Sequence, residues 1–183
     1  MTERLSDEQL MMNLVRGDKK AAAVLYDRYY QKVYGYFVRM TSDMDGSRDL
    51  TQNVFLRVIR YSDTWKNDKV FSYWLFRIAR NLMVDYHRGA RKFYDVGDDR
   101  EIKLRDQHDS VKEMEDHESH EFLLEAMAKL PPGFRELIEM NRFQGFSYKE
   151  IAETIASNEN AVRVKTFRAI QKLKEIYTSI IME

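Results

Sequence analysis

Apolar residues recur at helical spacing along most of the chain. They return every three or four positions in each long segment, and no segment alternates apolar and polar residues between turn signals. The two prolines and most of the seven glycines fall near places where helices would end. The pattern therefore predicts an all-α protein without internal repeats.

The N-terminal half predicts three helices before residue 62. Ser6 and Gln9 have the spacing of a capping box, which starts a helix that Gly17 and Asp18 interrupt. A long helix from Lys19 to Met40 follows, and residues 41–47 read as a turn. The residues of the long helix at core spacing are Val24, Leu25, Tyr29, Val33 and Phe37.

The third predicted helix, Asp49 to Tyr61, has two distinct faces. Its apolar stripe consists of Leu50, Val54, Val58 and Tyr61. The other side brings together a mostly polar set, namely Asp49, Gln52, Asn53, Leu56 and Arg60. We expect that second face to be exposed.

After a predicted loop at residues 62–68, a fourth helix runs from Phe71 to Lys92. Its core face consists of Phe71, Leu75, Ile78, Leu82 and Tyr86. The opposite face carries Trp74, Arg77, Arg80, Asn81, Val84, Asp85 and Arg88. An aromatic ring for stacking, guanidinium groups for phosphates and an amide for base edges are typical of single-strand recognition. Trp65 in the loop adds a second expected stacking surface, whereas Trp74 has the alternative of belonging to the core.

The C-terminal part predicts a helix-turn-helix. A helix over 121–130 ends at Pro131-Pro132-Gly133, and a second covers Phe134 to Phe143, with Phe134, Leu137, Ile138 and Phe143 as candidates for burial. The run Ser147-Tyr148-Lys149-Glu150 is a capping box that opens a short helix. A turn at 156–158 follows, and Asn158 can cap a long basic helix that continues to about Ile176.

The long basic helix again separates into two faces. Its core stripe is Val162, Thr166, Ala169, Leu173 and Ile176. The opposite face carries Asn160, Arg163, Val164, Phe167, Arg168, Gln171 and Lys174. Arginine and asparagine suit base edges, and an apolar side chain suits a thymine methyl group, so this face is expected to bind duplex DNA. An ordinary solvated helix would explain the charges but not an exposed valine and phenylalanine.

Charge is balanced overall but unevenly distributed. The chain has 30 basic and 30 acidic residues, yet residues 66–92 carry 7 − 2 = +5 and residues 106–125 carry 1 − 8 = −7. We therefore predict two small helical domains, 1–92 and 121–183, joined by a flexible acidic linker at 93–120.

Composition excludes several classes of function. Without cysteine there is no disulfide, thiolate zinc site or thiol nucleophile, and no apolar run reaches the length of a membrane span, so we expect a cytoplasmic protein without membrane insertion. An enzyme is the first rival: His117 and His120, beside Asp116 and Glu121, could hold a metal. That motif is weak by itself, and no phosphate-binding loop or catalytic triad accompanies it, so no enzymatic activity and no cofactor are expected.

Four stretches together resemble the extracytoplasmic-function group of bacterial RNA polymerase sigma factors. They are LYDRYYQKVYGYF (25–37), DLTQNVFLRV (49–58), FSYWLFRIARNLMVDYHR (71–88) and LPPGFRELIEMNRFQGFSYKEIAETIASNENAVRVKTFRAIQKL (130–173). Their order and spacing are more specific than any one of them.

The resemblance implies promoter-specific initiation of transcription with core RNA polymerase, bound at its clamp and flap. It implies clamp contacts for Asp49, Gln52, Asn53 and Leu56, although the family usually has an acidic residue in place of Asn53. It implies that the 71–92 helix opens the minus-ten element, with Asn81 reading a flipped base and Trp65 lining the pocket.

The resemblance also implies that the helix-turn-helix binds the minus-thirty-five element as duplex DNA. Asn160 and Ala161 replace a Gly-Thr pair that is frequent in the family, and Val164 replaces a small polar residue, so the promoter sequence cannot be transferred. The family further suggests a linker path toward the RNA exit channel and a cognate anti-sigma protein as partner. The second rival is a stand-alone helix-turn-helix regulator, which would leave Asn81, Trp74 and the Asp49 face without a function.

Overall fold

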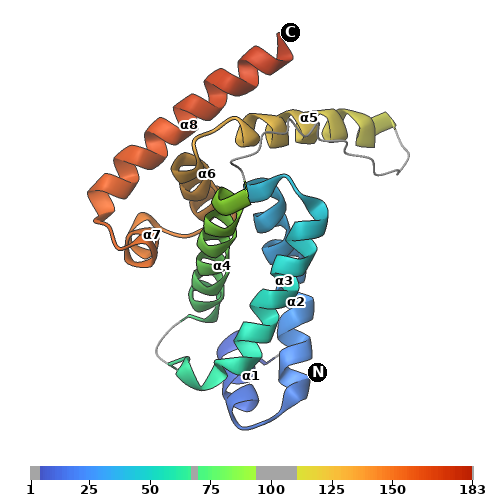
Figure 1. The fold of residues 1–183 in the computed structure, drawn as a ribbon, viewed down its shortest axis with the longest axis vertical. Helices are drawn as coiled ribbons and strands as arrows, with labels where there is room; N and C mark the ends of the chain where they lie inside the picture. The colour runs from blue at the N-terminus through green and yellow to red at the C-terminus, as the bar shows by residue number, and fades with distance from the viewer. Residues whose placement is uncertain (1–4, 67–69, 94–110, 183) are drawn as a thin grey trace. The chain divides into compact units, whose positions relative to one another are not determined.

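The described part of the chain is helical, as predicted. In the computed structural model it comprises residues 5–66, 70–93 and 111–182, with side chains described for 5–66, 70–87 and 120–182, and these ranges contain no strand. No helix within them is long and apolar enough to cross a membrane. The chain divides into two compact units, one built on the helices up to residue 93 and the other on those after residue 110 (Figure 1).

The described residues of the first unit form four α-helices and one short 3₁₀ helix. They are α1 (Asp7–Val15), α2 (Lys19–Thr41), α3 (Met44–Arg60), η1 (Ser62–Thr64) and α4 (Phe71–Phe93). The capping box predicted at the start of α1 is confirmed: Ser6 Oγ accepts from the Gln9 backbone N–H at 3.2 Å, and Gln9 Oε1 accepts from the Ser6 N–H at 2.8 Å. Each of these contacts satisfies a backbone donor that the helix cannot satisfy itself.

Helix α3 begins earlier than predicted, inside the segment read as a turn. Asp43 is its N-cap, and its carboxylate accepts from the Gly46 backbone N–H at 3.0 Å. Because this cap satisfies a free donor of the first turn, residues 44–47 join the helix and the turn prediction for them is wrong.

The core of the first unit lies between α2, α3 and α4. Leu25, Val33 and Phe37 of α2 are fully buried, as predicted, and α3 packs against α4 (Figure 1). Two predicted core residues are exposed instead. Val24 faces solvent, while Ala21, one turn earlier in α2, is buried. Tyr61 is 44% exposed because it follows α3 as its C-terminal cap and leaves the helical phase there.

The second unit is organised around its last helix. It contains α5 (Val111–Ala128), α6 (Pro132–Ile138), a π-helical turn η2 (Glu139–Phe143), α7 (Tyr148–Ile155) and α8 (Glu159–Ile181). Helix α8 contacts α5, α6 and α7. Its buried cluster consists of Met127, Leu130, Ile138 and Ala169, with Leu123, Phe134, Ile170, Leu173 and Ile176 packed around them.

Several boundaries in the second unit differ from the expectation. Helix α5 begins at Val111, before the predicted start at residue 121, and α8 extends past Ile176 to Ile181. The predicted helix over 134–143 is α6 followed by η2, in which Gln144 N–H donates to Glu139 O at 3.0 Å in the wider π pattern. Phe143 is exposed rather than buried. Most of the predicted acidic linker, residues 94–110, lies outside the described residues.

Candidate nucleic-acid interfaces

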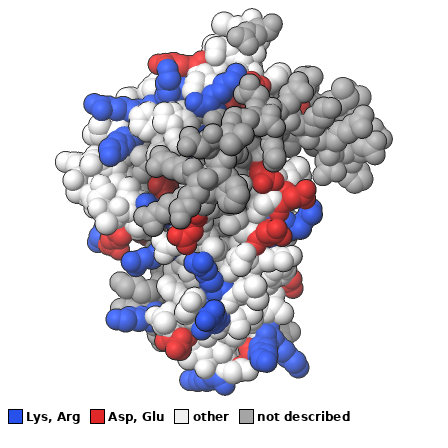
Figure 2. Space-filling model, viewed as in Figure 1, with Lys and Arg blue, Asp and Glu red and all other residues white. Residues whose placement is uncertain are grey.

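The two faces predicted for the long basic helix are present in α8. Val162, Thr166 and Ala169 are buried, whereas every residue of the predicted DNA face is exposed, namely Asn160, Arg163, Val164, Phe167, Arg168, Gln171 and Lys174. Val164 is 49% exposed and Phe167 is 63% exposed. Figure 2 shows lysine and arginine side chains gathered over α8, at the upper left of the view. The face therefore combines positive charge with apolar side chains in solvent.

The start of α8 is fixed by local signals that were visible in the sequence. Asn158 is its N-cap, and its Oδ1 accepts from the Ala161 backbone N–H at 2.8 Å. Helix α7 begins with the predicted capping box, in which Ser147 and Glu150 accept from each other's backbone N–H groups. Between the two helices Ala156 has a φ of 54°, a left-handed conformation that ends α7. This short helix, tight turn and long helix form the predicted helix-turn-helix.

Arg163 is held in place on the exposed face. Its Nη2 lies 3.0 Å from Glu159 Oε1, one turn earlier, and its guanidinium lies 5.9 Å from the centre of the Tyr148 ring. Both partners are partly exposed, so the pair is weak and can exchange for a DNA contact. Tyr148, which sequence reasoning treated only as part of the capping box, is a neighbour of this face.

Helix α4 presents the second candidate surface. Arg77 and Asn81 are exposed and Arg80 is half-buried. The core face is Phe71, Leu75, Phe76, Ala79, Leu82 and Met83, which shifts the predicted stripe because Ile78 and Tyr86 are only half-buried. Trp74 is half-buried at the border between the two faces, with its ring centre 6.3 Å from that of Phe71. The Arg88 side chain lies outside the described residues.

Trp65 is not the exposed stacking surface that was expected. It is only 6% exposed, and its backbone N–H donates to Ser62 O at 3.2 Å, which closes the turn of η1. Because η1 contacts both α1 and α3, the indole that follows it is buried in the core. The indole N–H has no hydrogen-bond partner within the described part of the chain. A flipped base cannot stack on Trp65 in this conformation.

Helix α3 exposes the predicted polar face. Asp49, Gln52 and Asn53 are all in solvent, and Asn53 Nδ2 donates to Asp49 O at 3.1 Å. Leu56 beside them is 64% exposed. Ile59, which the sequence interpretation did not include, is also exposed and lies three positions after Leu56.

A hollow of about 310 Å³ lies next to this face, between α2 and α3. Its apolar lining includes Tyr26, Phe55 and Ile59, and the rings of Tyr26 and Phe55 lie 4.8 Å apart. Exposed apolar residues beside a hollow are typical of a protein-docking surface.

No group of three histidine, aspartate or glutamate residues that could hold a metal occurs in the described ranges. The His117 side chain, half of the pair considered from the sequence, lies outside them.

Comparisons with known proteins match two family models to the chain. Residues 25–93 match the family Sigma-70 region 2, and residues 121–173 match Sigma-70, region 4. The chain is 30% identical to the ECF RNA polymerase sigma-E factor of Haemophilus influenzae, with 95% of this chain and 96% of that protein covered. It is 33% identical to the ECF RNA polymerase sigma factor BldN of Streptomyces coelicolor, with 93% of this chain and 67% of that protein covered.

Solved structures share the fold. CnrH in complex with the cytosolic domain of CnrY matches with a TM-score of 0.70 at 22% identity, over 94% of this chain and 97% of that chain. The sigma factor RpoE in complex with the anti-sigma factor NepR from Bartonella quintana matches with a TM-score of 0.71 at 20% identity, over 85% and 96%. With both sigma-70 regions matched in order and the relatives covered over most of their length, the chain belongs to the extracytoplasmic-function (ECF) sigma factors of the sigma-70 family, which act in transcription initiation by bacterial RNA polymerase.

Proposed function

We propose that this sigma factor recognises its promoter through two different forms of DNA. Helix α4 reads the minus-ten element as a melted single strand, and α8 reads the minus-thirty-five element as duplex. The observation that carries the proposal is the exposed face of α8, where Val164 and Phe167 stand in solvent beside Arg163 and Arg168. A helix face that only contacts water gives no reason for these two apolar residues. A face that contacts thymine methyl groups next to phosphates does, because the apolar side chains cover the methyl groups and the arginines bind the phosphates.

The minus-ten role of α4 draws on a different set of side chains. Asn81 offers a donor and an acceptor to the edge of a base, and Arg77 offers charge to phosphates. Flipping a base out of the stack costs a few kcal/mol, and stacking on an aromatic ring recovers about 1–3 kcal/mol. Trp74 is the ring available for this, because Trp65 is buried.

The clamp of core RNA polymerase is the proposed partner of α3. Asp49, Gln52 and Asn53 supply the polar contacts, and Leu56 supplies an apolar anchor that is now in solvent. Exposed apolar side chains rimmed by polar groups are typical of a protein-interaction surface.

Residues 1–92 would then form the docking and melting domain, and 121–183 would bind the flap and the minus-thirty-five duplex. The acidic linker would run between them, and the protein would act in the cytoplasm.

A cognate anti-sigma protein is the proposed regulator. The relative from Bartonella quintana was solved with the anti-sigma factor NepR, and CnrH was solved with the cytosolic domain of CnrY. In this chain the exposed faces of α3 and α8 are the surfaces that such a partner would cover, since both carry apolar side chains in solvent.

Two substitutions separate the proposed roles. Asn81→Ala should weaken promoter opening, measured by permanganate reactivity of unpaired thymines, and leave binding to core polymerase intact. Arg163→Ala should mainly weaken duplex recognition, by about 1–3 kcal/mol if it reads a base. If both variants lost polymerase binding equally, the division of roles between α4 and α8 would be wrong.

Because both sigma-70 regions match, the stand-alone regulator is not favoured, and a sizing column with core polymerase tests it directly. Co-migration together with promoter-specific transcription supports the sigma factor. A DNA-bound dimer that ignores polymerase would support the regulator instead.

A further inference from the structure

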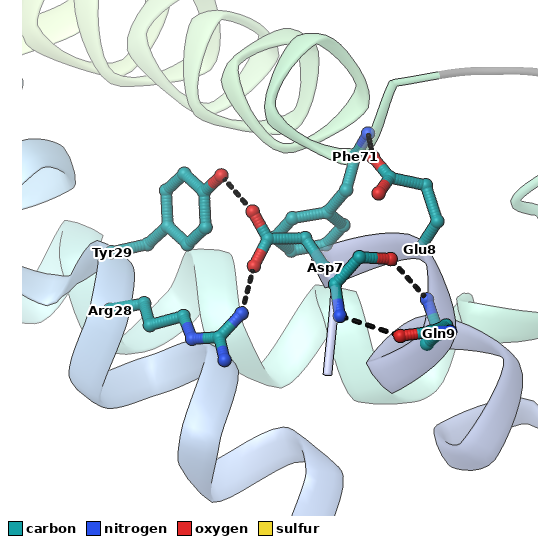
Figure 3. A network of polar contacts seen from close by, with 7 residues as sticks. Asp7, Glu8, Gln9, Arg28, Tyr29 and Phe71 are labelled. Carbon is teal, nitrogen blue, oxygen red and sulfur yellow. Dashed lines mark hydrogen bonds and ion pairs between the residues drawn. The ribbon is translucent and has the colours of Figure 1, made fainter. Parts of the chain in front are cut away.

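Helix α1 lies against the beginning of α4 (Figure 3). Glu8 Oε1 accepts a hydrogen bond from the Phe71 backbone N–H at 3.3 Å, although the two residues are 63 positions apart in the chain. The first N–H groups of a helix have no partner inside it, and a carboxylate there is favoured by the helix dipole. Glu8 therefore acts as a cap on α4 that is supplied by another helix.

The neighbouring acid of α1 holds the side chain against which Phe71 packs. Asp7 accepts from the Tyr29 hydroxyl, and its other oxygen accepts from Arg28 Nη1 at 2.7 Å (Figure 3). Burial and this hydrogen bond to Asp7 raise the pKa of Tyr29 well above its usual value, so the phenol stays protonated and keeps donating. The Phe71 ring meets the Tyr29 ring edge-on, with centres 5.2 Å apart and an interplanar angle of 78°.

Phe71, fixed in this way, contacts a residue of the candidate DNA surface. Its buried ring contacts Trp74, one turn further along α4. Trp74 is the half-buried ring proposed as the stacking surface for a base. Glu8 of α1 binds the backbone of Phe71, and Tyr29 of α2 packs against its ring. The position of Trp74 therefore depends on contacts outside α4.

We propose that Glu8 is a positioning residue for single-strand recognition: by capping α4 at Phe71, it holds Trp74 where a melted base can stack on it. This inference rests on the proposed minus-ten function of α4. Glu8 itself is negative and cannot attract phosphates, so simple electrostatics expects its removal to strengthen DNA binding. A loss of affinity would have to come from positioning.

Three substitutions of Glu8 separate its hydrogen bond from its charge. Glu8→Ala removes the acceptor and the charge, Glu8→Gln removes the charge but keeps an Oε1 acceptor, and Glu8→Asp keeps the charge on a side chain one methylene shorter. Asp45→Ala is the matched control, because Asp45 is also an acid in the first turn of a helix of this unit but lies in solvent beside Arg48. If the alanine variant does not fold, Glu8→Asp still tests the hydrogen bond, because it shortens the side chain without removing its charge.

The assay uses the full chain bound to core polymerase and a labelled single-stranded oligonucleotide, selected from a random pool by the wild-type complex. Glu8→Ala and Glu8→Asp should bind it about fivefold more weakly, the loss expected for one cap, while Glu8→Gln and Asp45→Ala stay near wild type. Core polymerase binding should be unchanged in all four. Acrylamide quenching of the free chain should increase in the weak variants through Trp74, because Trp65, the other tryptophan, is buried.

Each alternative gives a different result. Unchanged or tighter oligonucleotide binding by Glu8→Ala would overturn the positioning role. Equal losses of oligonucleotide and polymerase binding would assign Glu8 a general structural role instead. If the wild-type complex selected no single-stranded oligonucleotide, the proposed minus-ten recognition would itself be wrong, whatever Glu8 does.

Discussion

Replacing Phe167 with alanine should weaken binding to the minus-thirty-five duplex without destabilising the second unit. The residue is 63% exposed on α8, so its truncation removes little buried surface from the folded chain. Alanine also has the higher helix propensity, by roughly 0.5 kcal/mol in a helix interior. The thermal unfolding midpoint should therefore stay the same or rise slightly.

The expected loss of affinity follows from the exposed area of the ring. A phenylalanine side chain buries about 150–250 Å² when covered completely, so a mostly exposed ring leaves roughly 100 Å² free. If DNA covers about half of that area, at about 25 cal/mol per Å², the contact contributes roughly 1.3 kcal/mol, or close to tenfold in Kd. Because the contact is apolar, the dependence of log Kd on log salt should not change.

Two variants of the same helix are the controls. Val162→Ala lies on the opposite, fully buried face and should lower the unfolding free energy by about 2 kcal/mol. Arg168→Ala lies on the exposed face and, as a phosphate contact, should reduce the salt slope by about 1. Phe167→Ala should do neither, which separates an apolar base contact from packing and from charge.

The assay is fluorescence anisotropy of the polymerase complex on a labelled duplex, repeated over several salt concentrations. The duplex carries a promoter mapped from the transcripts that appear when the chain is overexpressed. An unchanged Kd for Phe167→Ala would refute a DNA contact at this ring. A fall in stability like that of Val162→Ala would refute the exposed placement of the ring.

Four further predictions concern other parts of the chain. Leu56→Asp should abolish co-migration with core polymerase on a sizing column, while the free energy of unfolding changes by no more than about 0.5 kcal/mol, the range of surface substitutions; persistent co-migration would remove Leu56 from the interface. Ser147→Ala removes the acceptor for the Glu150 N–H and should lower the unfolding free energy in urea by about 1 kcal/mol. Ala156→Gly should raise that free energy by about 1 kcal/mol, because φ is 54° there, and a decrease would contradict the left-handed cap. Neutral substitutions of the acidic residues within 93–120 should slow initiation or promoter escape in transcription assays, and unchanged transcription would exclude a role for the acidity of this segment.

Features set by local interactions were predictable from the sequence. The capping boxes at Ser6 and Ser147 and the cap at Asn158 each depend on residues within three positions of one another. The two faces of α8 follow from helical phase, which persists through a regular helix whose buried side is a continuous stripe. That is why all seven residues of the predicted DNA face of α8 are exposed.

Features set by exact helix ends or by contacts between distant elements were not predictable. Helical phase places Tyr61 on the core stripe of α3, but the helix ends one residue earlier and the side chain turns outward. Trp65 looked like a loop residue, yet η1 packs against α1, a helix that begins near residue 7, and buries it. The hydrogen bond from Phe71 to Glu8 likewise joins two segments whose proximity no local pattern encodes.

Trp74 illustrates how the two kinds of information combine. From the sequence it was either a stacking surface or a core residue, and in the structure it is half-buried on α4, with its ring against that of Phe71. A ring anchored on one edge loses less conformational freedom when a base stacks on it than a freely rotating ring would. Half-burial is therefore compatible with the DNA role, and it makes that role depend on Phe71 and on the contacts that fix it.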